Sequence, residues 1–239
     1  MWRVAGLVLL AACGRGFFNP DLSPDPDAAT PVTAPSYVQS NYATSSMGQV
    51  TAIDAAFPLS QTAGNTIVVV VMWDSTNAAL LTLFDRAGNT YRSAAGPTLT
   101  NGNWTQTSFI ATDIAGGAAG TNVVEADLNA SSPMRIAVLE YANVSTAQPL
   151  DGNAQAKGDS GMLPAISITT ANPNELLVVA ASTDYMFTDV FPTPATRVSG
   201  TNFFVQDKAA PVPATHVFAT PNGTSNGNWV AQVLALQGR

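Results

Sequence analysis

The chain has 239 residues, of which 46% are hydrophobic and only 10% charged, and its formal net charge is −7. This composition excludes the basic stripe that a nucleic-acid partner requires, and it excludes a polybasic attraction to anionic lipid. Thr, Ser, Asn, Gly and Ala replace the missing Lys and Glu, which favours strands joined by turns over surface helices.

The first twelve residues read as an export signal. Arg3 precedes an apolar run, residues 4–12, that is too short to span a bilayer as a helix. Leu10-Ala11-Ala12-Cys13 resembles the lipobox of bacterial lipoproteins. The resemblance implies cleavage before Cys13, the only cysteine, and acylation of its thiol. We therefore expect a lipid-anchored protein of the cell envelope, and Gly14-Arg15 favours the outer membrane if the cell is Gram-negative.

Residues 13–35 are expected to form the acylated end and a disordered tether. Five prolines alternate here with aspartates such as Asp21 and Asp25, and few apolar residues remain to form a core. Closely spaced prolines extend a chain toward polyproline II. The tether would hold the following domain away from the membrane surface.

Residues 36–239 are long enough for one domain with a buried core, and their pattern predicts strands. Ten segments share a short length, β-branched or alternating composition and flanking turn residues: 66–73, 80–84, 105–112, 121–128, 135–141, 165–170, 176–182, 203–207, 215–219 and 229–236. Ten or more short strands at such spacing predict an all-β fold, an antiparallel β-sandwich of jelly-roll type.

A weak internal match adds the hypothesis that the sandwich arose from a duplicated half. Asn65-Thr66-Ile67-Val68 resembles Asn174-Glu175-Leu176-Leu177 in pattern. In each case another apolar strand follows later, at 136–141 and at 230–236. No linker separates the two pieces, so we expect them to share one core.

The chain is also similar to uncharacterised secreted β-sandwich domains of bacteria. The resemblance rests on Gly-Asn-Thr-Ile-Val-Val-Val (64–70), Asp85-x-x-Gly88-Asn89-Thr90-Tyr91, Glu140-Tyr141-x-Asn143-Val144 and Pro149-Leu150-Asp151. It implies a β-sandwich in an extracellular setting, and it carries over no catalytic residues.

Two patterns suggest hydrolases. Gly158-Asp159-Ser160-Gly161 resembles the nucleophile segment of chymotrypsin-like proteases, but the single histidine, His216, follows the serine, opposite to that family's order, so a polar loop is preferred. Glu125, Asp127 and Asn129 share one face of a strand, a spacing similar to that of a jelly-roll glycoside hydrolase family. Asn129 stands where that family has a second catalytic carboxylate. A carbohydrate-active hydrolase that uses Glu125 and Asp127 is therefore kept only as the alternative function.

Metal and ligand candidates are few. One histidine and one cysteine exclude the usual zinc cage, while calcium stays a candidate at Asp85 with Asn89, or at Asp184 with Asp189. Asp and Asn in turns more often bond their own backbone.

The aromatic residues Trp104, Tyr91 and Tyr185 are candidates for stacking on a ligand such as a glycan, whereas Trp73 and Trp229 are expected in the core. The leading prediction is a non-enzymatic module for binding, adhesion or envelope structure, with a glycan or an envelope protein as partner.

Overall fold

Strands β3 (Thr66–Asp74) and β11 (Glu175–Thr183) lie at the centre of the fold because both of their faces are buried. In this computed structural model, which describes residues 32–45, 48–75, 77–100, 104–188, 194–219 and 227–239, all nine residues of β11 and the first eight of β3 are buried. Successive side chains of a strand point to opposite faces of its sheet. A layer must therefore cover each side of these two strands.

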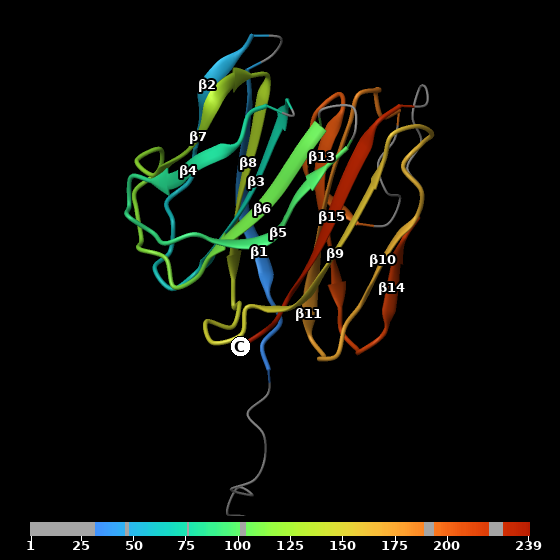
Figure 1. The fold of residues 1–239 in the computed structure, drawn as a ribbon. Helices are drawn as coiled ribbons and strands as arrows, with labels where there is room; N and C mark the ends of the chain where they lie inside the picture. Colours follow the sequence, from blue (N-terminus) through green and yellow to red (C-terminus); the bar gives the residue numbers. More distant parts are fainter. Residues whose placement is uncertain (1–31, 46–47, 76, 101–103, 189–193, 220–226) are drawn as a thin grey trace, which may run out of the picture. The chain divides into compact units, whose positions relative to one another are not determined.

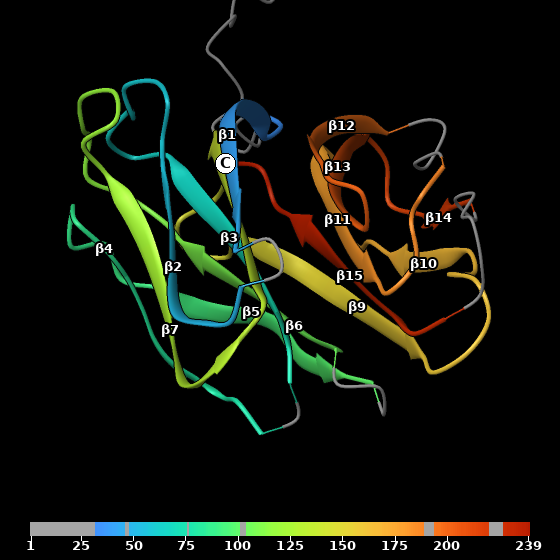
Figure 2. The same ribbon diagram turned by 90° about the horizontal axis from the view of Figure 1, so that it is seen from above.

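Four sheets stack in the order small, large, large, small (Figures 1 and 2). The first large sheet has the order β1 (Ser36–Thr44), β8 (Met134–Ala142), β3, β6 (Trp104–Ala111), β5 (Arg92–Leu99); its small sheet is β2 (Val50–Ala56), β7 (Val123–Ser132), β4 (Leu80–Asp85). The second large sheet has the order β12 (Ala195–Ser199), β13 (Phe203–Ala210), β11, β15 (Trp229–Leu236), β9 (Leu150–Gly158); its small sheet is β10 (Ile166–Thr169), β14 (Thr215–Phe218). We call each large sheet with its small sheet a half.

Three apolar clusters separate the four sheets. Val68 and Val70 of β3 face Val178 of β11 in a central cluster between the two large sheets. The alternate residues of β3 and β11 pack outward, Ile67 against the first small sheet and Leu177 against the second. The two halves thus share a central core, as the sequence predicts.

The predicted all-β, antiparallel sandwich is confirmed, and all ten predicted segments are strands. Within the first half the pairs are nested: β1 with β8, β2 with β7 and β3 with β6. A jelly roll would add β4 with β5, but β5 pairs with β6 at the edge of the large sheet. The jelly-roll type in the strict sense stays a prediction.

The strand order of the first half repeats in the second. The large sheets have the orders β1, β8, β3, β6, β5 and β9, β15, β11, β13, β12, and strands at the same position in the two lists correspond in chain order as well. In the small sheets, the pair β10 and β14 corresponds to the pair β2 and β7. This agreement supports a duplicated half. The sequence match of Asn65 with Asn174 is wrong by one residue, because it would set Ile67, which faces the small sheet, against Leu176, which faces the central core.

Buried polar groups also join the two large sheets. Gln232 of β15 donates from Nε2 to the Thr98 hydroxyl (2.8 Å) and accepts from the Ser108 hydroxyl (2.6 Å). Beside the central cluster, the Arg197 guanidinium forms two hydrogen bonds of 2.8 and 2.9 Å with Asp207, and the Tyr141 hydroxyl donates to the same carboxylate. Such directional contacts restrict how one sheet can lie on the other.

The predicted signal peptide, Cys13 and most of the predicted tether lie outside the described residues. The described chain begins slightly before the predicted domain start at residue 36. The Thr33 amide donates to the Arg239 carbonyl at 2.5 Å, and the Asn174 side chain donates to the Val32 carbonyl. In the part of the chain that the structure describes, no helix has the length and hydropathy to cross a membrane.

Candidate functional site

An apolar groove lies along the first half, where the sheets differ in width. The first large sheet has five strands and its small sheet only three, and β4 is the edge strand of the small sheet. Beside β4 the structure leaves a hollow of about 540 Å³. Its floor is the face of β6 and β5 that points toward the small sheet, and its wall is β4.

Apolar side chains dominate this groove. Phe109 lies on the floor, Leu80 and Leu83 on the wall, and Trp73 and Tyr91 also line the hollow. Leu81 is 64% exposed and Leu99 is 40% exposed, and both line the same hollow. Large apolar side chains that stay in contact with water gain free energy when another molecule covers them.

Three of the hydroxyl groups that line the groove have partners within the protein. The Thr82 hydroxyl donates to the Asp127 carboxylate (2.6 Å), the Thr107 hydroxyl donates to the Ala95 carbonyl (3.2 Å), and the Tyr91 hydroxyl donates to Asp85 (2.8 Å). These contacts leave mainly carbon surface for a ligand to meet.

Tyr91, one of the three predicted ligand-binding aromatics, is part of the groove. Its hydroxyl is fixed by Asp85, and burial together with the negative charge of Asp85 raises the pKa of Tyr91 well above its ordinary value. The phenol therefore stays neutral. The uncharged ring of Tyr91 can therefore pack against a ligand in the groove.

The other two predicted aromatics lie elsewhere and are buried. Trp104 is 7% exposed, and the Arg135 guanidinium lies 5.2 Å from its ring centroid. Tyr185 is 5% exposed in the outer core of the second half, where its hydroxyl accepts a hydrogen bond from the Leu163 amide. Both rings are buried, so both differ from the exposed rings expected of stacking residues. Trp73 and Trp229 are in the core, as predicted.

The proposed calcium ligands Asp85 and Asn89 bond to each other. Asp85 accepts from the backbone and side-chain nitrogens of Asn89 (2.9 and 2.7 Å), from Tyr91, and from the Asn122 amide (3.1 Å). Burial raises the pKa of Asp85, but these hydrogen bonds outweigh it and hold the pKa below its ordinary value. Asp85 thus organises the turn after β4, the commoner use of such residues.

Glu125 and Asp127 do share the solvent side of β7, as predicted. Glu125 lies opposite Asp54 in the neighbouring strand and lines a hollow of only about 120 Å³. Pockets for small ligands usually measure roughly 300–1,000 Å³. The groove on the other side of the small sheet is within that range.

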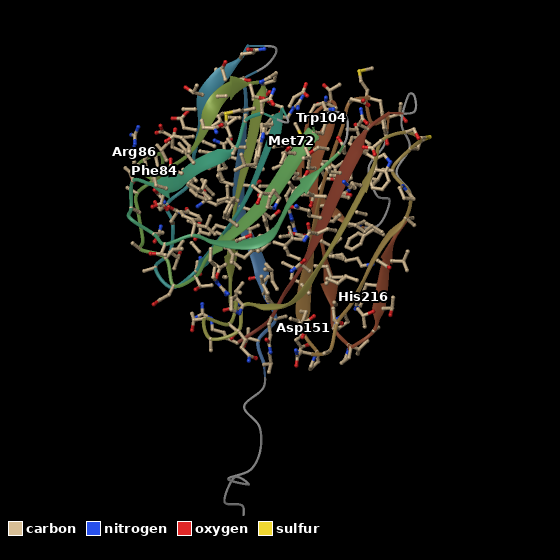
Figure 3. All side chains as sticks on the ribbon, viewed as in Figure 1. Met72, Phe84, Arg86, Trp104, Asp151 and His216 are labelled. Atoms are coloured by element: carbon tan, nitrogen blue, oxygen red, sulfur yellow. The ribbon has the colours of Figure 1, made fainter. Side chains whose placement is uncertain are left out.

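The remaining predicted residues are separate from the groove. His216 lies on β14, where its Nε2 contacts the Thr170 hydroxyl at 3.2 Å, and Ser160 follows β9. Figure 3 shows His216 in the second half, far across the molecule from Phe84 and Arg86, which flank Asp85. Asp184 accepts from the Asn228 side chain (2.8 Å), while Asp189 lies outside the described residues. Among the described residues, no group of three or more His, Cys, Asp and Glu could hold a metal ion.

Sequence reasoning missed a buried carboxyl group, that of Glu175. Its side chain is 1% exposed, and neither oxygen has a hydrogen-bond partner among the described residues. Burial and the neighbouring Asp151 carboxylate raise its pKa to about 7. Asp151 accepts from the Ala171 amide and the Asn172 side chain (2.5 and 2.6 Å). The signal was visible in the sequence, because Glu175 directly precedes the apolar run of β11.

The groove residues Leu81, Leu99 and Phe109 were missed as well. Leu80-Leu81-Thr82-Leu83-Phe84 is apolar on both faces of what proves to be an edge strand, and that excess could have indicated a surface for binding. Comparison with known proteins adds nothing to this assignment: no family model matches the chain, and neither the curated proteins nor the solved structures contain a match.

Proposed function

We propose that this protein is a non-enzymatic binding module and that the groove between β4 and β5 holds its ligand. The observation that carries the proposal is the 540 Å³ hollow with Leu81 and Leu99 exposed in its lining. A concave, mainly apolar site of this size is the usual form of a ligand pocket. The ligand presents apolar groups to the groove, because the lining is mainly apolar and the hydroxyl groups of Thr82, Tyr91 and Thr107 already donate to Asp127, Asp85 and Ala95.

The proposal includes the setting predicted from the N-terminal sequence. Acylation of Cys13 would anchor the module at the cell envelope, with residues 13–35 as its tether, and a module of this kind would serve recognition or adhesion there. Metabolic labelling with a palmitate analogue tests the anchor. Labelling of the wild-type chain that is lost in Cys13→Ser supports acylation, and equal labelling of both proteins rejects it.

Titration with the neutral apolar dye Nile red tests the groove. The wild-type protein should give a saturable rise in dye fluorescence, and Leu81→Asp should weaken dye binding by about tenfold or more because it places a charge in the lining. Val217→Asp is the matched control, since Val217 is 55% exposed on β14 of the other half. Equal dye binding by the two variants would reject the groove as the site.

A further inference from the structure

The second half shows what fills the position that the groove occupies in the first half. Because the two halves have the same strand order, β13 corresponds to β6 and β11 to β3. The faces of β6 and β13 that point toward the small sheets are therefore equivalent surfaces. In the first half this surface is the groove floor.

Backbone geometry fixes the register of the comparison. Gly64 and Asn174 both have positive φ, 85° and 57°, just before the central strand of each half. Aligning these two residues sets Ile67 against Leu177 and Val71 against Ala181, all of which face the small sheets. Thr107 is opposite Val71 in the first half, and Phe204 is opposite Ala181 in the second. Thr107 of the groove floor therefore corresponds to Phe204.

A peptide segment of the chain itself covers Phe204. The ring of Phe187 meets the ring of Phe204 edge to face, with centroids 4.7 Å apart, and Tyr185 packs on Phe187 at 5.8 Å. The segment is held by backbone as well, because the Phe187 amide donates to the Thr201 carbonyl at 3.0 Å. The covering segment thus presents aromatic side chains at alternate positions.

In the first half the segment after β3 instead runs past Ala78 into β4, which pairs with β7, and the face of β6 at Thr107 lines the groove. Thr107 is smaller than the equivalent Phe204, and the groove beside it is bounded by two edge strands, β4 and β5. Edge strands present backbone groups that can pair with an added strand. Aromatic side chains at alternate positions of an extended peptide would point to the same side, toward the floor.

We propose that the groove binds an extended peptide segment of a partner protein that carries aromatic side chains at alternate positions, as Tyr185 and Phe187 cover the equivalent surface of the second half. This inference rests on the proposed function, because it names the ligand of the same groove. The peptide would add to the edge of β4 through its backbone and place its rings between Phe109 and the exposed Leu81.

The test uses a synthetic peptide with the sequence of residues 182–188, Ser-Thr-Asp-Tyr-Met-Phe-Thr, and a control peptide with both aromatic residues replaced by serine. Binding to the full chain carrying Cys13→Ser is measured by titration calorimetry. The aromatic peptide should bind at least about tenfold more tightly than the serine peptide, and Leu81→Asp should remove that difference while Val217→Asp keeps it.

Equal binding of the two peptides, or an aromatic preference unchanged by Leu81→Asp, would overturn the inference. The Nile red titration separates this result from failure of the proposed function. If the dye binds in the groove and the aromatic peptide shows no preference, the peptide inference is wrong and the apolar binding site stands. If neither ligand is affected by Leu81→Asp, both are wrong.

Discussion

The side chain of Gln232 crosses the boundary between the two large sheets and donates a hydrogen bond to the Gln106 carbonyl oxygen, 2.9 Å away. Gln106 in turn accepts from the Ser182 hydroxyl (2.7 Å) and donates to the Ala180 carbonyl (3.2 Å). Both glutamines are fully buried. The two halves are therefore joined by polar contacts that run in both directions, in addition to the apolar cluster beside them.

Replacing Gln232 with leucine should destabilise the protein by about 2–3 kcal/mol, because the buried hydroxyls of Ser108 and Thr98 each lose a partner while the side-chain volume is kept. Urea unfolding measures the change. Gln148→Leu is the control, since Gln148 is an exposed glutamine that should shift the unfolding free energy by no more than about 0.5 kcal/mol. Equal stability of the two variants would show that these polar contacts between the halves do not stabilise the folded protein.

Among the described strands, the predictions from sequence found all seven interior strands but only three of the eight edge strands, β4, β10 and β14. The ten segments recognised include the central strands β3, β8, β11 and β15. The five strands that were missed, β1, β2, β5, β9 and β12, are all edge strands. An edge strand such as β9, Leu-Asp-Gly-Asn-Ala-Gln-Ala-Lys-Gly, buries little apolar surface, so it carries no hydrophobic run for sequence reasoning to detect.

The site was only partly predictable for a related reason. Tyr91 was singled out for its aromatic ring and does line the groove. The groove exists because β5 pairs with β6 and three strands cover five, and such long-range pairing cannot be read from local patterns. Trp104 was predicted to be a candidate for stacking on a ligand, whereas it is the first residue of the buried strand β6.

Glu175 should make the stability depend on pH between its ordinary pKa of 4.5 and its raised pKa of about 7. In this interval the folded protein holds a proton on Glu175 that the unfolded chain releases. The free energy of unfolding contributed by this group should therefore be greatest below pH 4.5 and fall as the pH rises toward 7.

Glu175→Gln keeps the side-chain shape but cannot bind or release a proton. The unfolding free energy of this variant should therefore lack the decline between pH 4.5 and about 7. Urea unfolding at a series of pH values, with the wild-type curve subtracted from the variant curve, isolates the effect. The subtraction also removes the contribution of Asp85, which is the same in both proteins. Because the pKa of Asp85 is lowered in the folded protein, its contribution to the free energy of unfolding is lost only as the pH falls below about 3.8. A flat difference between the two curves would contradict the raised pKa of Glu175.

The alternative function, a carbohydrate-active hydrolase, would require Glu125 and Asp127 of β7 for catalysis. If the groove is the functional site, the double change Glu125→Gln with Asp127→Asn should leave peptide and dye affinity within about twofold of the wild type. Both carboxylates lie on the solvent side of the small sheet, and an amide oxygen at position 127 can still accept the hydrogen bond from Thr82. Calorimetry and a screen for glycan hydrolysis check this together. Glycan cleavage by the wild-type protein that the double variant loses would favour the hydrolase.

The most direct measurement of ligand binding in the groove is methyl NMR of leucine-labelled protein during titration with Nile red. We expect the methyl signals of Leu81, Leu83 and Leu99 to shift together, because these three side chains line the groove. Leu59, 58% exposed but not part of the lining, should stay in place. Shifts confined to Leu59 or to leucines of the second half, with Leu81 and Leu99 unmoved, would contradict the account.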